Sequence, residues 1–367
     1  MKKIMFKLFV FYTLLLCVLM LCAGVGEVSA KFDAKANNSD RELGVMTRNM
    51  YLGTDFDNIF AATNQTSLFI AVGAAYSRVQ PGNVPERIAG IADEIEAASS
   101  ALVGLQEVAL WRTGTFGDPA AAETVTFDFL AMLHAELAAR GLNYVTVAEQ
   151  ENFDAELPAL INFTPAFDVR FTDRVVILAR TDLKKSQFKL ENTHAQQFTA
   201  TFTIPQGLFA GLPIPRGWTS ADVKMRGKNY RFVNAHLESF SPVINFMQAN
   251  ELLQTAGNTN LPLIFAGDFN SDAESNEAAY QLFINDGFRD VWEETHPNEP
   301  GLTWALFLTD PYTYTNPSQR LDLILIRGEI DALDADVVGE NPLTDRTPSG
   351  LMRSDHAGVT ASLKLKP

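Results

Sequence analysis

Eight polar side chains of types that bind cations or transfer protons lie at or beside the ends of apolar segments throughout the chain. They are Asn49, Glu107, His236, Asp268, Asn270, Asp322, Asp355 and His356. Carboxylate and amide oxygens are ligands for hard divalent cations, and a histidine can gain or lose a proton near neutral pH. Together these residue types would provide a metal site and acid–base groups, if the fold brings them to one place.

Taken singly, each of these residues has a simpler explanation. An Asn or Asp after a strand usually begins a turn, and a lone histidine such as His236 is more often a structural residue. The ordered set is what indicates a site. A packed sheet brings strand ends together at one rim, and loops on a rigid sheet commonly carry catalytic groups.

The elements that must position these side chains are strands and helices mixed along the chain. Many of the strands lack strict alternation of apolar and polar residues, which predicts sheets buried against helices in one α/β or α+β domain. Residues 110–125 and 150–220 do not fit a minimal domain and are predicted to be insertions or long loops. The predicted strands are 43–50, 101–105, 174–179, 230–234, 261–266, 321–326 and 359–365, and the predicted helices are 85–99, 126–140, 242–256 and 274–285.

The first thirty residues have the layout of a secretory signal peptide. Three lysines occur within the first seven residues, an apolar run covers residues 8–21, and small residues precede a cleavage point near Ala30. A membrane anchor is the alternative, but this run of about 14 residues is short compared with the roughly 20 that span a bilayer. We therefore expect export, secreted or periplasmic, with residues 31–42 as a flexible lead-in and 43–367 as the folded domain.

Both cysteines, Cys17 and Cys22, lie inside this leader segment. Each follows a leucine rather than a small residue, which disfavours a lipoprotein. The mature chain would contain no cysteine, so it could use neither disulfides nor thiolate ligands. Any metal would therefore be bound by carboxylates, amides, carbonyls or histidines, a set that favours a hard cation such as magnesium.

The formal charge of −15 limits the partners of the chain. A strongly acidic protein repels a polyanion at long range, so tight nonspecific nucleic-acid binding is not expected. A local basic groove stays possible, and solubility alone would also explain the charge. No stable protein partner is predicted.

Five segments of the chain resemble the signature blocks of the endonuclease/exonuclease/phosphatase superfamily, in the order found in that family. The segments are Leu105-Gln-Glu-Val108, Asn234-Ala-His-Leu-Glu238, Gly267-Asp-Phe-Asn270, Arg320-Leu-Asp-Leu-Ile324 and Ser354-Asp-His356. The resemblance covers roughly residues 43–365. It implies a four-layer α-β-β-α sandwich, in which two mixed sheets pack face to face with helices outside each and the site lies at one edge. Known members include deoxyribonucleases, abasic-site endonucleases, inositol polyphosphate phosphatases and neutral sphingomyelinases.

The resemblance also implies a metal site. Glu107 would be the central ligand, and Asn49 and Asp355 occupy the positions that complete the site in the family. Hard oxygen ligands of this kind suit Mg²⁺ or Mn²⁺.

The remaining residues are expected to act on the phosphate and on water. Asp268 would orient or deprotonate the attacking water, and Asn270 would reach a phosphate oxygen. His356 would contact the phosphate while Asp322 holds its ring, since a carboxylate on one ring nitrogen fixes the tautomer. His236 would be a second phosphate contact or a proton donor.

The chain departs from the family pattern before the strand near residue 175. Many relatives carry an asparagine and a glycine there, whereas this chain has Asp173 and Arg174. Arg174 could bind a phosphate through its charge. Asp173 could orient that arginine or make a surface ion pair.

The leading hypothesis is an exported, divalent-metal-dependent phosphoester hydrolase of phosphodiesterase or endonuclease type. Its substrate would be a nucleic acid, a phospholipid or a sugar phosphate. The alternatives are a phospholipid or inositol-phosphate phosphoesterase and, less favoured, a catalytically silent binding module on the same fold. Apolar residues in 198–218 could form a membrane- or substrate-facing lip, or an ordinary hairpin packed on the core.

Overall fold

The computed structural model describes residues 42–80, 82–162, 166–184, 188–225 and 227–366. The predicted signal peptide, its cleavage point near Ala30, both cysteines and residues 31–41 lie outside these ranges. Among the residues described, none of the helices has both the length and the apolar character needed to cross a bilayer.

The first of two main sheets contains eight strands. Its order is β15-β16-β1-β2-β6-β3-β4, and β5 pairs with β6 beside this path. Strands β1 and β2 run parallel, while the other pairs are antiparallel. The strands are β1 (Glu42–Asn49), β2 (Leu102–Gln106), β3 (Leu110–Thr115), β4 (Thr124–Asp128), β5 (Tyr144–Ala159), β6 (Phe167–Arg180), β15 (Ile330–Val338) and β16 (Gly358–Leu365).

The second main sheet has six strands in the order β13-β14-β12-β11-β10-β7, with β11 and β12 parallel. A separate two-stranded sheet pairs β8 with β9. These strands are β7 (Phe188–Gln197), β8 (Phe202–Thr203), β9 (Pro213–Ile214), β10 (Gly217–Met225), β11 (Lys228–His236), β12 (Leu263–Asp268), β13 (Arg289–Asp290) and β14 (Asp322–Arg327).

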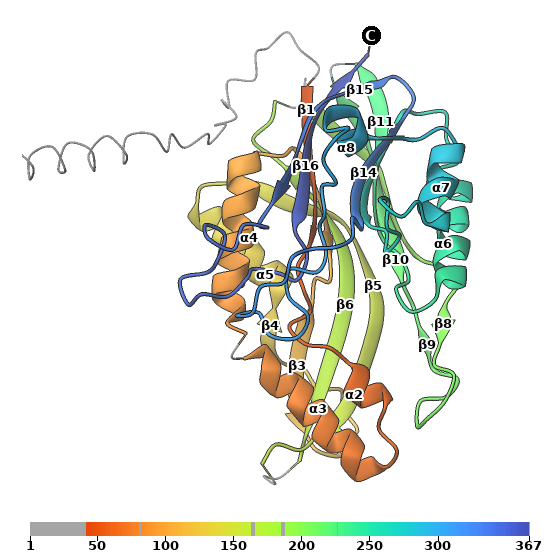
Figure 1. Ribbon diagram of the computed structural model, residues 1–367. Helices are drawn as coiled ribbons and strands as arrows, with labels where there is room; N and C mark the ends of the chain where they lie inside the picture. Colours follow the sequence, from red (N-terminus) through yellow and green to blue (C-terminus); the bar gives the residue numbers. More distant parts are fainter. Residues whose placement is uncertain (1–41, 81, 163–165, 185–187, 226, 367) are drawn as a thin grey trace, which may run out of the picture. The chain divides into compact units, whose positions relative to one another are not determined.

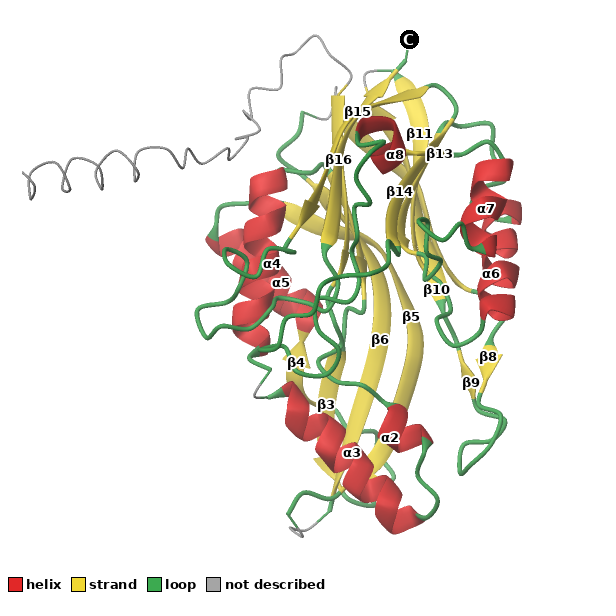
Figure 2. Cartoon of the chain, viewed as in Figure 1, coloured by secondary structure: helices red, strands yellow, loops and turns green. Residues whose placement is uncertain are grey.

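Helices cover the outer faces of the two sheets. Figure 1 shows α4 and α5 on one side of the sheet pair and α6 and α7 on the other, and Figure 2 shows the sheets between them. The helices are α2 (Asp57–Phe60), α3 (Gln65–Val79), α4 (Val84–Ala98), α5 (Phe129–Ala139), α6 (Pro242–Gln254), α7 (Ala278–Asn285) and α8 (Val291–Thr295). The predicted α+β class with two mixed, face-to-face sheets is confirmed.

Three apolar layers hold this arrangement together, and single strands contribute to two of them. In β1, Val45 packs in the layer between the sheets, and the next residue, Met46, packs against the helices. Successive side chains of a strand point to opposite faces, so a strand buried on both faces is apolar at every position. That is why the central strands read as continuous apolar runs in the sequence.

Two predictions about secondary structure are wrong. Most of residues 110–125 and 150–220 belong to sheet strands rather than to insertions, because β3, β5, β6, β7 and β10 all draw on them. The predicted helix 126–140 begins only at Phe129. The side chain of Asp128 accepts hydrogen bonds from the backbone N–H groups of Leu130 and Ala131 and so caps the helix where β4 ends.

Candidate active site

The ends of three neighbouring strands place His236, Asp268 and Asp322 in one row. His236 is the last residue of β11 and pairs in register with Asp268, the last residue of β12. Asp268 also pairs with Asp322, the first residue of the antiparallel strand β14. All three side chains are almost completely buried. The register of the second sheet therefore produces this cluster directly.

The first sheet brings Asn49 and Glu107 to the same place. Asn49 ends β1, and its side-chain nitrogen donates to Glu107 Oε1 at 3.1 Å and to Asp268 Oδ2 at 3.0 Å. The second oxygen of Glu107 accepts the backbone N–H of Leu52 at 2.8 Å. Glu107 follows β2 with φ of 56°, a left-handed conformation that is uncommon outside glycine and occurs often at functional sites. Asn49 thus joins the two sheets at their common rim.

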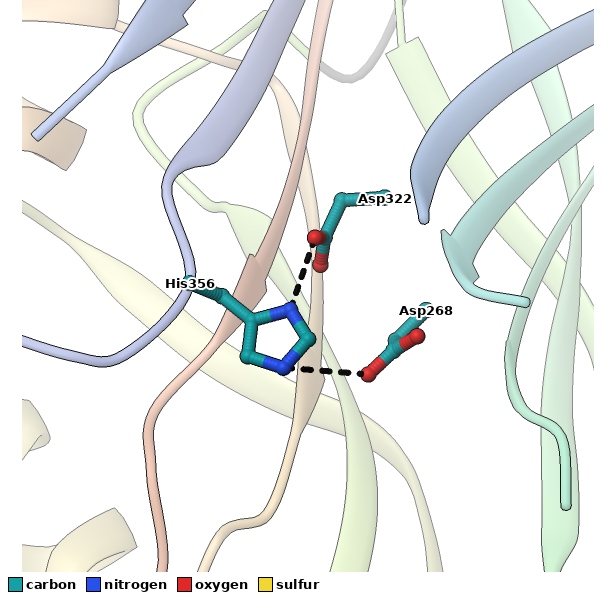
Figure 3. Close-up of side chains that lie close together, drawn as sticks. All are labelled: Asp268, Asp322 and His356. Carbon is teal, nitrogen blue, oxygen red and sulfur yellow. Dashed lines mark hydrogen bonds and ion pairs between the residues drawn. The ribbon is translucent and has the colours of Figure 1, made fainter. Parts of the chain in front are cut away.

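His356 completes the cluster from the segment before β16. Its Nδ1 lies 2.8 Å from Asp322 Oδ2, and its Nε2 lies 3.7 Å from Asp268 Oδ2 (Figure 3). Burial by itself would lower the pKa of His356, but the carboxylates of Asp322 and Asp268 outweigh it and hold the pKa well above its usual value. The two carboxylates therefore favour the protonated form of the ring.

The segment that carries His356 is anchored to the first sheet. The Ser354 hydroxyl donates to the backbone carbonyl of Asn49 at 2.9 Å, and the backbone N–H of His356 donates to Ser354 Oγ at 3.2 Å. The Arg48 guanidinium donates to the carbonyl oxygen of His356 and pairs with Glu94 at 2.8 Å. These contacts fix the backbone on which the imidazole stands.

Arg216 is a site residue that the sequence analysis did not select. It precedes β10, and the first residue of that strand, Gly217, pairs in register with His236. One guanidinium nitrogen of Arg216 lies 3.2 Å from each ring nitrogen of His236. Burial, followed by the positive charge of Arg216 and of His356, lowers the pKa of His236 well below its usual value, which favours the neutral form of this histidine. The only signal in the sequence was an arginine inside the apolar segment 198–218.

Arg174 is not placed to bind a phosphate in the cleft, so this prediction is wrong. Its guanidinium donates to Asp128 at 2.6 Å, to Glu149 at 3.2 Å and to the carbonyl of Val108 at 2.9 Å. These partners neutralise the charge of Arg174 on the face of β6 that is turned away from the cleft. Asp173, one residue earlier, lies on the other face, receives a hydrogen bond from Asn152 at 2.9 Å and lines a cavity next to Glu107.

A cleft of about 450 Å³ opens over this cluster. Six residues that the sequence analysis assigned to the site line this cleft, and Arg216 lines it as well. The six are Glu107, His236, Asp268, Asn270, Asp355 and His356. Asn49 and Asp322 lie beneath the lining of the cleft and contact lining residues, Asn49 through Glu107 and Asp268 and Asp322 through His356. Asn270 donates its amide to the carbonyl of Leu237 at 3.0 Å, and its backbone N–H donates to Asp268 Oδ1 at 3.0 Å.

The carboxylates of the cleft repel one another. Burial, and then the negative charge of Asp355, raises the pKa of Glu107 to about 7. Burial is also the main reason why the pKa of Asp268 is raised to about 6 and that of Asp355 lies above its usual value. A group of carboxylates whose pKa values are raised in this way fits a bound divalent cation, which would stabilise their charged forms.

One group of three residues in the described part of the chain has ligand atoms close enough together to hold such an ion. Asp268, Asp322 and His356 each offer a ligand atom, and these atoms lie within 4.8 Å of one another. Protonation of His356, which the neighbouring carboxylates favour, would compete with ligation by its ring nitrogens. The oxygens of Glu107 and Asp355 suit a hard cation better. The amide oxygen of Asn49 accepts the backbone N–H of Tyr51 at 2.9 Å, so Asn49 presents its nitrogen to the carboxylates here.

Comparison with known proteins agrees with this fold. The family model for the endonuclease/exonuclease/phosphatase family matches residues 70–356. The chain belongs to this family, whose members are phosphoester hydrolases. No curated protein matches the chain in a sequence comparison.

Several solved structures share the fold at low sequence identity. A family member from Beutenbergia cavernae has a TM-score of 0.54 and 18% identity, covering 89% of this chain and 72% of that one. A family member from Bacteroides thetaiotaomicron has a TM-score of 0.52 and 18% identity, with coverage of 89% and 95%. A mannosyl-6-phosphatase from the same species has a TM-score of 0.50 and 19% identity, with coverage of 88% and 99%.

Proposed function

We propose that this protein is an exported, divalent-metal-dependent hydrolase of phosphoester bonds, of phosphodiesterase or endonuclease type. The observation that carries the proposal is the environment of one oxygen, Asp268 Oδ2. Asn49 donates to it at 3.0 Å, His236 Nε2 lies at 3.5 Å and His356 Nε2 at 3.7 Å. A carboxylate surrounded in this way at the floor of a cleft is positioned to hold and activate a water molecule.

Each neighbouring residue has a role that its charge state supports. Asp268, with a pKa raised to about 6, can accept a proton from water near neutral pH more readily than an ordinary aspartate. His356, kept protonated by Asp322, would donate a hydrogen bond to a phosphoryl oxygen. Arg216 would bind a second phosphoryl oxygen, and neutral His236 would contact the phosphate beside it.

Glu107 and Asp355, with Asn49 beside them, are the residues we assign to Mg²⁺ or Mn²⁺. Such an ion would stabilise the negative charge that develops on the phosphoryl and leaving oxygens. Asn270 lines the cleft, and its amide would contact the phosphate. A silent binding module is less well supported, because Glu107, Asp268 and His356 are all present.

The test is a substrate panel with the mature chain, starting at Lys31, in magnesium and after exhaustive chelation. The panel should contain plasmid DNA, RNA, sphingomyelin, inositol phosphates, mannose 6-phosphate and a chromogenic phosphodiester. We expect hydrolysis that EDTA abolishes and that Mg²⁺ or Mn²⁺ restores. Glu107→Gln should lower turnover by at least about a hundredfold, because a metal ion contributes several kcal/mol to charge stabilisation. Full activity after chelation would refute the metal site, and failure on every substrate would refute the proposed chemistry.

Export is tested separately. The full-length chain, expressed in a secreting bacterial host, should be recovered outside the cytoplasm with Lys31 as its first residue. N-terminal sequencing measures this, and an intact amino terminus on cytoplasmic protein would contradict it.

A further inference from the structure

A second cavity, of about 310 Å³, lies between helices α2 and α3 and strands β5 and β6. We call it the apolar cavity. Its volume falls in the range of roughly 300–1,000 Å³ that is typical of ligand pockets. Aromatic rings form much of its wall, among them Phe56, Phe60, Trp111, Phe153, Phe171 and Phe209.

A third, smaller cavity of about 210 Å³ lies between the apolar cavity and the catalytic cleft and shares lining residues with both. This connecting cavity shares four phenylalanines with the apolar cavity. At its other end it shares Glu107, Arg216 and Ser239 with the catalytic cleft. A single ligand could therefore place a phosphate beside Arg216 and extend an apolar substituent past the phenylalanines.

The wall chemistry restricts what the apolar cavity can hold. Glu156 is the one charged residue among the described residues that line it, and its carboxylate accepts the backbone N–H of Ala122 at 2.7 Å. The cavity thus offers few free polar groups to a base, a sugar or a second phosphate. Burying such polar groups without partners would be unfavourable, whereas a hydrocarbon chain needs none.

An unfilled gap in the protein core is the alternative explanation. Several wall residues argue against it, because Phe56, Phe60, Phe153 and Phe209 are only half-buried. Apolar rings that face a solvent-accessible cavity keep an unfavourable contact with water, which an apolar occupant would remove. Phe209 belongs to the loop between β8 and β9, and its ring packs against that of Phe60 with centroids 6.5 Å apart.

Two further exposed apolar side chains lie in this lining or directly after it in the sequence, since Phe240 lines the connecting cavity and Val243 follows Pro242 of the catalytic cleft. Phe240 contacts the rings of Phe60 and Phe202, yet it remains 51% exposed. Val243, at the start of α6, is 68% exposed. An apolar rim of this kind suits a ligand that brings a hydrocarbon chain to the cleft.

We propose that the apolar cavity receives the long alkyl or acyl chain of a lipid phosphoester while its phosphate lies in the catalytic cleft. This proposal rests on the proposed function, which it narrows to one substrate class. In the reaction, water forms a new P–O bond and the P–O bond to the leaving alcohol breaks. Asp268 takes up the proton lost by the attacking water and later returns it to solvent, and solvent supplies the proton that the leaving alkoxide takes up. Water is the only co-reactant.

The first test is a series of alkyl p-nitrophenyl phosphates with methyl, butyl and octyl groups, used below their aggregation concentrations with Mg²⁺. All members release the same p-nitrophenolate, so they differ only in the chain. We expect kcat/KM to rise by about threefold to fourfold for each methylene that becomes buried. Hydrolysis of the methyl ester with no rise along the series would overturn the lipid inference and leave the proposed function intact.

Two variants locate the effect in the apolar cavity. Ala155→Leu adds volume to its wall, and Phe209→Ser removes one of its rings. Each should lower the octyl-to-methyl ratio of kcat/KM by at least about tenfold. Leu208→Ser is the matched control, because Leu208 is exposed, adjacent in the same loop and outside the lining of all three cavities. A wild-type ratio in both cavity variants, with normal melting curves, would refute the assignment.

A binding measurement keeps the two proposals distinguishable. Octylphosphonate and methylphosphonate cannot be hydrolysed at their C–P bond, and calorimetry gives their Kd values without turnover. Tighter binding of the octyl compound, reduced in Phe209→Ser and not in Leu208→Ser, supports the cavity assignment even if no ester is cleaved. Equal Kd values for the two phosphonates would overturn the assignment, whatever the hydrolysis assays show.

Discussion

At the scale of single residues, Asp268 receives contacts from both sheets and from two histidines. Asp268→Asn keeps the size of the side chain and an acceptor for Asn49, so we expect the melting temperature to change little. Turnover should fall by roughly a hundred- to ten-thousandfold, the usual range for a positioned acid or base. The control is Asp334→Asn, at an exposed carboxylate outside the cleft lining. Near-normal turnover of Asp268→Asn would show that its assigned role is wrong.

The two arginines near the site should respond differently to the same substitution. Arg216→Ala removes a cation from the cleft lining, so KM should rise and turnover should fall, while stability changes little. Arg174→Ala removes ion pairs to Asp128 and Glu149, and should cost about 2 kcal/mol of unfolding free energy with KM unchanged. Steady-state kinetics and urea denaturation separate these outcomes. If Arg174→Ala instead raised KM and left stability unchanged, the sequence prediction for Arg174 would be restored.

At the scale of elements, the ion pair between β1 and α4 supports the segment of His356. Arg48 and Glu94 are both buried, and Arg48 also donates to the carbonyl of His356. Arg48→Met leaves the Glu94 carboxylate with Arg353 as its remaining partner at 3.1 Å. We expect a loss of about 3 kcal/mol in unfolding free energy and a lower kcat, because removing one partner of a buried pair is strongly destabilising.

The double variant Arg48→Met/Glu94→Leu separates the two effects. It removes both buried charges and should recover part of the lost stability, as replacing an entire buried pair by apolar groups often does. The kcat should stay low, since the anchor of the His356 carbonyl is still missing. Full recovery of kcat would mean that this anchor does not position His356.

At the scale of the whole molecule, the raised pKa of Glu340 makes the free energy of unfolding depend on pH. Burial, together with the nearby carboxylates of Asp345 and Asp336, raises its pKa in the folded state to about 7. The folded protein therefore holds this proton more tightly than the unfolded chain, whose glutamate has a pKa near 4.5. The stabilisation is fully present below about pH 4.5 and is lost as the pH rises through 7.

Glu340→Gln removes this dependence. The variant should melt at a higher temperature than the wild type at pH 8, and at nearly the same temperature at pH 5. Melting curves of both proteins at the two pH values measure the difference. A gap of equal size at pH 5 and pH 8 would contradict the assigned titration.

Much of this fold and site follows from local properties of the sequence. The central strands are buried on both faces, so their continuous apolar runs identify them without knowledge of their partners. Polar residues that interrupt such runs at their ends, such as Glu107, Asp268 and His356, stand out for the same reason. Their convergence at one rim was predicted, and the structure brings them together around one cleft.

Other features depended on contacts that no local pattern contains. Strand β5 has a mixture of exposed and buried positions and two irregularities in its register, so its pattern resembled a loop. In β6, Asp173 and Arg174 point to opposite faces because side chains alternate along a strand. The packing of the sheets decides whether Asp173 or Arg174 is turned toward the cleft. Arg216 reaches His236 only because β10 pairs with β11 in one register. The sequence by itself determined the central strands and most of the reactive groups, whereas register and sheet packing decided which charges share the cleft.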